Sequence, residues 1–303
     1  MLRLFCVRAA ALGFATALVN SCSAYPPPAA RPAGSGNPPP VAHNALPLQV
    51  ALIPPNPPPA IVGQSAIVVD IASGRVLFAK NADLPREVAS TQKIITALCV
   101  LDAGDIDQPV TIQANDAACE PTKLDLKPGE VYTRRELLKV LMVKSANDVA
   151  RALARDVGGN PQAFAELMNR KSAALGMRKS NFITPNGLPV QGQYSTARDM
   201  AIAARAAYRS PLLRSYAATK AFSFVFNDGH IREIENTNRL LKSVPYCNGL
   251  KTGTTNAAGR CLVATGSLNG RAVIVVVLKS TTPNIWKDST QLLRWALERP
   301  TGA

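Results

Sequence analysis

The sequence predicts an α/β (α+β) fold in which strands from both ends of the chain form one antiparallel sheet and the middle forms a separate helical lobe. Near the start, two β-rich segments at 65–71 and 75–79 flank a Ser-Gly turn, the pattern of a hairpin. In the middle, apolar residues recur at helical spacing. Near the end, strand-like segments at 261–265 and 272–279 are joined through an Asn-Gly pair, a strong hairpin signal.

The predicted helices follow the first hairpin. One helix begins near Ser90 and stops near Gly104. A second opens at a capping box formed by Thr133 and Glu136, because a glutamate three residues after a threonine N-cap satisfies free backbone N–H groups. Further helical patterns cover 146–157, 161–175 and 196–208.

The chain after Ile61 is expected to fold as one domain. Its length of about 240 residues suits a single large α/β domain, which we place at 61–300, with the helical lobe at about 105–235. Lys251 lies on one of the late strands, and an amphipathic helix ending near Leu297 closes the domain.

Residues 1–24 have the pattern of a secretory signal peptide. Arg3 and Arg8 precede an apolar run of 11 residues, too short to span a bilayer, and small residues follow up to Ala24. Cys22 also lies in a sequence that resembles a bacterial lipobox. We expect export to the periplasm or another extracytoplasmic site, with signal cleavage, lipid attachment at Cys22 and an uncleaved N-terminal membrane anchor as alternatives.

Residues 25–60 form a proline-rich linker. Thirteen of the 24 prolines fall between Pro26 and Pro59. Because proline fixes φ and has no N–H group, this segment is expected to be extended rather than helical or paired in a sheet. It is either a spacer between an anchor and the domain or a leader without such a task.

The net charge and the cysteine spacing limit which partners and which metal sites are expected. A formal net charge of +14 suits nucleic acid, an anionic surface or an acidic substrate, but export argues against nucleic acid. The cysteine spacings match no metal-site pattern, so no metal is expected. Cys247 and Cys261 flank a predicted hairpin and either form a disulfide or stay as separately buried thiols.

Three short motifs occur in a fixed order along the chain: Ser-Thr-Gln-Lys at 90–93, Ser-Ala-Asn at 145–147 and Lys-Thr-Gly at 251–253. Each alone is a weak signal, but the ordered set is typical of penicillin-binding proteins and class A β-lactamases. In these motifs, and from about Ser65 to about Leu297, the chain resembles the serine D-alanyl-D-alanine carboxypeptidases of the penicillin-binding protein family.

The resemblance implies a β-lactamase/transpeptidase-like fold, with a five-stranded antiparallel sheet flanked by helices, an all-helical lobe, and an active cleft between them. The residues suit covalent catalysis. Ser90 and Lys93 are three positions apart at a helix start, so the amine reaches the hydroxyl. A lysine is a poor base at its ordinary pKa, and burial beside the second cation Lys251 would lower that pKa.

By the resemblance, Ser145 relays a proton and Asn147 holds the substrate backbone; capping of the following helix is a second interpretation of Ser145. Lys251 and Thr252 would bind the terminal carboxylate of the substrate. Gly253 would leave room for a substrate peptide that adds alongside the strand.

The same resemblance assigns the oxyanion hole to the backbone N–H groups of Ser90 and Thr254. It also matches the segments 186–188 and 194–200 to family signatures, which we interpret as scaffold. Many family members carry an arginine just before the last helix. Because this chain has none there, carboxylate recognition is expected to shift to Thr252, Thr254 or Lys287.

The function expected is a serine carboxypeptidase that trims peptidoglycan stem peptides ending in D-Ala-D-Ala through an acyl-enzyme, without metal or organic cofactor, and that β-lactams inhibit. A D-alanyl cross-link endopeptidase and a non-catalytic wall-binding protein are alternatives. A class A-like β-lactamase is a third, but the segment 166–169 has the wrong spacing for the deacylating glutamate of that class.

Overall fold

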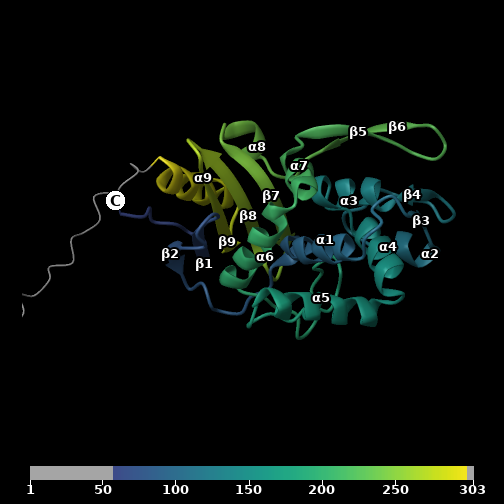
Figure 1. The fold of residues 1–303 in the computed structure, drawn as a ribbon, viewed down its shortest axis with the longest axis horizontal. Coiled ribbons are helices and arrows are strands. Elements are labelled where there is room, and N and C mark those ends of the chain that lie inside the picture. Colours follow the sequence, from purple (N-terminus) through teal and green to yellow (C-terminus); the bar gives the residue numbers. More distant parts are fainter. Residues whose placement is uncertain (1–56, 299–303) are drawn as a thin grey trace, which may run out of the picture. The chain divides into compact units, whose positions relative to one another are not determined.

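The computed structural model describes residues 57–298, which belong to one compact unit (Figure 1). The predicted signal peptide, the lipobox at Cys22 and most of the proline-rich linker lie outside the described residues. Within residues 57–298, no helix combines the length and apolar character needed to cross a membrane.

Five antiparallel strands form the main sheet in the spatial order β2-β1-β9-β8-β7. Their bounds are β1 Ser65–Asp70, β2 Val76–Lys80, β7 Cys247–Thr255, β8 Gly259–Leu268 and β9 Arg271–Ser280. Strand β1 pairs with β9, so the two ends of the domain share one sheet, as predicted. Because β9 is central, its apolar run is buried on both faces.

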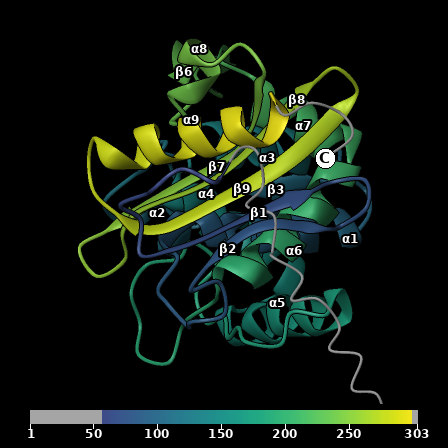
Figure 2. The ribbon, with the colours of Figure 1, turned by 90° about the vertical axis from the view of Figure 1, so that its left-hand side faces the viewer.

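Helices cover both faces of this sheet. Helix α9 (Asn284–Leu297) lies across β8 and β9 on one face, whereas α6 (Ala197–Arg209) packs against β1 and β9 on the other (Figure 2). Alternation along β8 fits this arrangement: Leu262 belongs to the core under α9, and Val263 belongs to the larger core shared with the helices. Strand β7 is left at the sheet edge, beside the helical part of the domain.

The helical region lies between β2 and β7. Its elements are η1 Ala89–Gln92, α1 Lys93–Asp102, α2 Ala114–Ala117, α3 Arg134–Val143, α4 Asn147–Gly158, α5 Pro161–Leu175, α6, α7 Pro211–Ala218 and α8 Leu240–Ser243. The predicted capping box opens α3: Thr133 Oγ1 accepts from Glu136 N at 3.2 Å, and a Glu136 carboxylate oxygen accepts from Thr133 N at 2.7 Å. Helix α1 is buried along most of its length, so it forms the centre of this region.

The region is not all-helical, which corrects the expectation. Strand β3 (Pro109–Thr111) pairs with β4 (Val131–Thr133), and β5 (Ala221–Val225) forms a hairpin with β6 (Ile231–Glu235) that extends along α3 (Figure 1). The β5–β6 signal was present in the sequence. In the sequence, phenylalanines occur at every second position before an Asp-Gly turn. In the structure, the ring of Phe224 packs against Phe226 of the same segment and against Tyr132 of β4.

The two cysteines near the late hairpin are separate thiols. Cys247 lies opposite Gly266 in the β7–β8 ladder, whereas Cys261 lies opposite Gly253, so the register keeps the two side chains apart. Both are buried, and burial raises the pKa of the Cys261 thiol to about 11. Of the two open alternatives, the structure supports buried thiols, which behave as small apolar side chains.

Candidate active site

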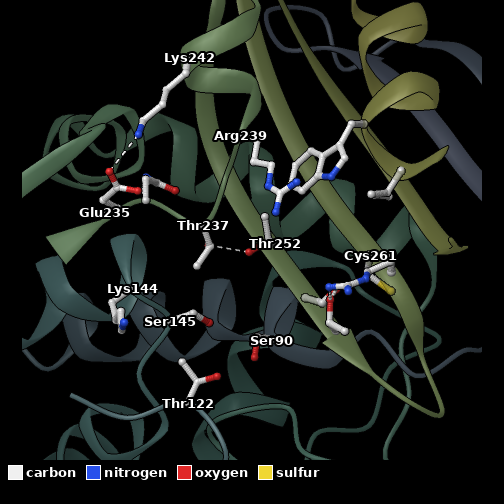
Figure 3. A pocket seen from close by; sticks show the side chains of 16 residues that line it. Ser90, Thr122, Lys144, Ser145, Glu235, Thr237, Arg239, Lys242, Thr252 and Cys261 are labelled. Atoms are coloured by element: carbon white, nitrogen blue, oxygen red, sulfur yellow. Dashed lines mark hydrogen bonds and ion pairs between the residues drawn. The ribbon is translucent and has the colours of Figure 1, made fainter. Parts of the chain in front are cut away.

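The three sequence motifs meet at one pocket of about 690 Å³ between the edge strand β7 and the helical region. Ser90 comes from η1, Ser145 from the corner between α3 and α4, and Thr252 from β7 (Figure 3). These segments are far apart in the chain, and the packing of β7 against η1 brings them together. The motif residues predicted from spacing are therefore assembled in one place.

The nucleophile candidate and its base candidate lie in contact. Ser90 is in the 3₁₀ turn η1, and Lys93 is the first residue of α1. Lys93 Nζ is 2.9 Å from Ser90 Oγ. Lys93 is fully buried whereas Ser90 is partly exposed to the pocket, so the serine faces the space that a substrate would fill and the lysine lies behind it.

The amine of Lys93 has three oxygen partners. Besides Ser90 Oγ, it is 2.7 Å from Asn147 Oδ1 and 2.8 Å from the carbonyl oxygen of Asn186. A charged ammonium has three N–H donors and satisfies all three oxygens. A neutral amine keeps two donors for Asn147 and Asn186, which leaves its lone pair directed to the Ser90 hydroxyl. The same geometry therefore holds both protonation states.

The electrostatic environment favours the neutral amine. Burial lowers the pKa of Lys93 well below its usual value, and the positive charge of Lys251 lowers it further, against weaker opposing effects of Cys119 and Asp148. Burial also lowers the pKa of Lys251, to about 7. Because two buried ammonium groups close together repel each other, a charge on Lys251 favours the neutral form of Lys93.

Gly253 explains how β7 approaches the nucleophile so closely. A Cβ atom at this position would lie 2.9 Å from the backbone nitrogens of Ser90 and Thr91, closer than real side chains come. The glycine is therefore required by the contact between β7 and η1. The expectation that Gly253 leaves room for the substrate peptide stays a prediction beside this packing role.

Ser145 adopts a strained conformation that directs its side chain into the site. Its φ of +67° lies in the left-handed region, which costs a non-glycine residue on the order of 1–3 kcal/mol. The N-cap of α4 is Ala146, so the capping interpretation of Ser145 is wrong. Its Oγ is buried without a hydrogen-bond partner among the described residues. Unused hydrogen-bonding capacity next to Ser90 fits a group that contacts substrate.

The threonines of β7 make side-chain contacts that the sequence did not reveal. Thr252 Oγ1 is 2.6 Å from Thr237 Oγ1, which comes from the segment before α8 (Figure 3). Thr254 Oγ1 donates to the carbonyl oxygen of Gly253 at 2.9 Å and accepts from Arg260 Nη1 at 2.9 Å. Thr252 and Thr254 both line the pocket, as expected of substrate-binding residues.

Several pocket residues were missed or misplaced by sequence reasoning. Asn186 was interpreted as scaffold, yet its carbonyl oxygen contacts Lys93 and also accepts from Ser90 Oγ at 3.3 Å. Arg239 and Arg260 line the pocket, whereas Lys287, proposed as a carboxylate ligand, is exposed and does not. The Pro-Asn-Gly turn at 185–187 was a usable signal, because its glycine packs directly on the backbone before Ser90.

Replacement of Lys251 by methionine is expected to move the acidic limb of the acylation rate to higher pH. The Lys251 charge holds the pKa of Lys93 down, so its removal raises that pKa, and the neutral base appears only at higher pH. The measurement is the second-order rate of acylation by a penicillin against pH, for wild type and Lys251→Met. A limb that stays in place, or moves to lower pH, would contradict the coupling of the two lysines.

Comparison with known proteins agrees with this site. Residues 53–282 match the family model described as D-alanyl-D-alanine carboxypeptidase. The chain is 33% identical to a D-alanyl-D-alanine endopeptidase of Pseudomonas aeruginosa, covering 86% of this chain and 82% of that protein. It is 34% identical to the D-alanyl-D-alanine carboxypeptidase DacF of Bacillus subtilis over 73% of this chain, but spans only 58% of that relative's length.

Among solved structures, the DD-transpeptidase of Streptomyces K15 superposes with a TM-score of 0.74 at 32% identity, covering 79% of this chain and 98% of that one. The β-lactamase/transpeptidase-like fold predicted from the motifs is therefore confirmed. From the family match over most of the domain, together with these relatives, the chain belongs to the D-alanyl-D-alanine carboxypeptidase family of serine peptidases.

Proposed function

We propose that this protein is a serine carboxypeptidase that removes the terminal D-alanine from peptidoglycan stem peptides ending in D-Ala-D-Ala. One observation carries the proposal most directly: the fully buried Lys93 amine lies 2.9 Å from Ser90 Oγ, with two further acceptors that hold it in place when neutral. A serine with such a base forms acyl-enzymes, the chemistry of this family.

In the acylation step, neutral Lys93 accepts the proton of Ser90 Oγ as the oxygen attacks the carbonyl carbon of the penultimate D-alanine. The tetrahedral intermediate then collapses, the peptide C–N bond breaks, and the leaving nitrogen takes a proton. Ser145 is the proposed relay for that proton, because its hydroxyl is buried beside the pocket and has no competing partner among the described residues.

Other groups would stabilise the reacting carbonyl and position the peptide. The backbone N–H groups of Ser90 and Thr254 are assigned to the oxyanion hole, on residues adjoining the close contact of η1 with β7. Asn147 is assigned to the substrate backbone by the family resemblance; its Oδ1 accepts from Lys93, and its Nδ2 donates to the carbonyl oxygen of Glu120 at 3.3 Å. Lys251 provides a buried positive charge close to Lys93.

Water completes the cycle by hydrolysing the ester at Ser90, which releases the shortened stem peptide. β-Lactams would acylate the same serine and inhibit the enzyme. The first 24 residues carry an export pattern, so we place the protein on the peptidoglycan side of the membrane, with an N-terminal membrane or lipid anchor as an alternative to free export.

Cleavage of D-alanyl cross-links is the second candidate, because one relative is named an endopeptidase and the motifs do not separate the two activities. We favour trimming because two arginines, Arg239 and Arg260, line the pocket, and guanidinium groups suit a free carboxylate.

Digestion of purified sacculi by the full chain, followed by mass analysis of the muropeptides, tests this choice. Trimming predicts loss of pentapeptides, by at least about tenfold over a Ser90→Ala sample, while cross-linked dimers persist. Conversion of dimers to monomers with pentapeptides intact would instead identify an endopeptidase. No change in either species would remove both peptidoglycan activities.

A further inference from the structure

The carboxylate-binding end of the pocket has a different construction from the one the family pattern implies. Many family members place an arginine just before the last helix, and here that segment, at the start of α9, contributes Ile285 and Trp286 to the pocket. In this chain that segment therefore supplies an indole to the pocket rather than a guanidinium. Arginines from two other elements line the same pocket: Arg239 at the start of α8 and Arg260 on β8.

Arg260 is positioned by the pairing of β8 with β7. It lies opposite Thr254 in the ladder, and its Nη1 donates to Thr254 Oγ1 at 2.9 Å. A guanidinium has five N–H donors, so one bond to a threonine fixes its position and leaves most donors available. The planar N–H groups of arginine match a carboxylate with two parallel hydrogen bonds.

The distance along β7 suits a terminal carboxylate. Gly253 contacts the backbone of Ser90, and the next residue, Thr254, carries the oxygen that binds Arg260. In a substrate whose penultimate carbonyl lies at Ser90, the terminal carboxylate lies one residue further on, at most about 3.6 Å along an extended chain. Thr254 therefore lies one residue beyond the nucleophile contact on β7, the strand that the substrate would follow, and Arg260 reaches that point from the neighbouring strand β8.

The hydroxyl groups nearby supply few donors of their own. Thr254 already donates its proton to Gly253 O, so it has none left for a carboxylate. Thr252 and Thr237 lie 2.6 Å apart, so one of them donates to the other and only one hydroxyl proton stays free. A carboxylate that accepts several hydrogen bonds needs a further donor here, which Arg260 provides.

The charges of the two arginines are not neutralised within the domain. Among the described residues, no acidic side chain forms an ion pair with Arg239 or Arg260, whereas Lys242 in the same pocket is paired with Glu235 at 3.1 Å. The Arg239 guanidinium lies 5.7 Å from the ring centroid of Trp286, within the range of a cation–π contact (Figure 3). Another cation of this pocket, Lys144, lies beside Ser145 on the helical side.

We propose that Arg260 binds the terminal α-carboxylate of the substrate, with Arg239, held against Trp286, as a second cation beside it. Arg260 thereby takes the place of the arginine that this chain lacks before α9, and the Thr254–Arg260 pair sets the preference for a free peptide terminus. This inference rests on the carboxypeptidase activity proposed above and names the residues that give it its substrate class.

The test compares two peptides that differ only at the terminus: a stem pentapeptide ending in D-Ala-D-Ala with a free carboxylate, and the same peptide with a C-terminal amide. Binding is measured by calorimetry in a Ser90→Ala background, so that it does not depend on turnover, and kcat and KM are measured with Ser90 present. Arg260→Gln, Arg260→Lys and Arg239→Gln are the variants. Lys242→Gln is the matched control, because it removes a charge that is already paired with Glu235.

Arg260→Gln is expected to weaken binding of the free acid about 10- to 100-fold, the scale of a charged hydrogen-bonded pair, mainly through KM, and to leave the amide unchanged. Arg260→Lys recovers part of the loss, because it keeps the charge without the planar fork. Arg239→Gln causes a smaller loss, and Lys242→Gln causes none.

Two results overturn the inference: equal binding of acid and amide before any arginine is changed, or an Arg260→Gln variant that loses both peptides alike. Carboxylate-selective binding that depends on Arg260, without any hydrolysis when Ser90 is present, would instead leave the inference standing and remove the proposed carboxypeptidase activity. The two failures are therefore distinguishable.

Discussion

The Ser90→Ala variant is expected to release D-alanine from a D-Ala-D-Ala pentapeptide at a rate lower by on the order of 10⁴-fold or more. In the Ser90–Lys93 pair, the serine oxygen forms the covalent bond to the substrate, and the lysine only moves a proton. Removal of that oxygen therefore prevents the acyl-enzyme from forming at all. Labelling by a fluorescent penicillin is expected to disappear with it.

The folded state is expected to tolerate this change, which makes the measurement interpretable. Loss of the Ser90 hydroxyl leaves Lys93 with Asn147 Oδ1 and the Asn186 carbonyl as partners. The melting temperature is therefore expected to stay within a few degrees of wild type. Ser172→Ala is the matched control: that buried serine on α5 donates to the carbonyl oxygen of Met168 at 2.8 Å and does not line the pocket. Equal D-alanine release by wild type and Ser90→Ala would end the assignment.

The same labelling separates a carboxypeptidase from a β-lactamase. The sequence lacks the glutamate spacing that class A β-lactamases use for fast deacylation, so the penicilloyl group on Ser90 is expected to persist for minutes or longer. Rapid multiple turnover of a chromogenic β-lactam would reverse this interpretation. A wall-binding protein without catalysis would show neither labelling nor release of D-alanine.

The sequence predicted those features of the site that depend on residues close together in the chain. Ser90 and Lys93 are close because of their spacing at a helix start, and the hairpin signal around Asn269 and Gly270 placed the late strands correctly. Lys251 was expected to act as a second cation, and the structure places it, fully buried, where its charge lowers the pKa of Lys93.

The parts that the sequence did not predict depend on packing between distant segments. The Asn186 carbonyl beside Lys93 has no side-chain signature, because every residue has a carbonyl group. The contact of Arg260 with Thr254 requires the β7–β8 register, and the left-handed φ of Ser145 follows from the tight corner between α3 and α4. Such features need coordinates, because local propensity does not encode them.

The packing of β7 also adds contacts at Gly253 and Thr254 that the motif did not indicate. Motif positions give residue types but not directions, and Gly253 faces the backbone of Ser90 while the Thr254 proton is used by a neighbouring carbonyl. A pattern that identifies a binding strand therefore does not determine which of its groups contact the substrate. The donor proposed above for the carboxylate is Arg260, which lies outside all three motifs.

Lys93→Arg is expected to lower the rate of acylation of Ser90 at least about 10²-fold, the scale of positioned general-base catalysis. Arginine keeps the positive charge but does not lose its proton in proteins, so it cannot take the proton of Ser90. It is also longer, whereas the lysine amine lies within 2.9 Å of each of three oxygens in a fully buried position. Lys93→Met tests the same step without the charge and removes the three hydrogen bonds that the amine makes to those oxygens.

Fluorescent-penicillin labelling and D-alanine release measure the loss in both Lys93 variants, and melting temperatures show whether the domain still folds. Lys171→Arg is the matched control, because Lys171 on α5 lies outside the pocket and is paired with Asp102 at 2.7 Å, a contact that arginine can keep. The depressed pKa of Lys93 gives the wild type an acidic limb below the usual range for lysine, and neither variant is expected to show it. A Lys93→Arg protein that folds normally and labels at the wild-type rate would show that another group is the base.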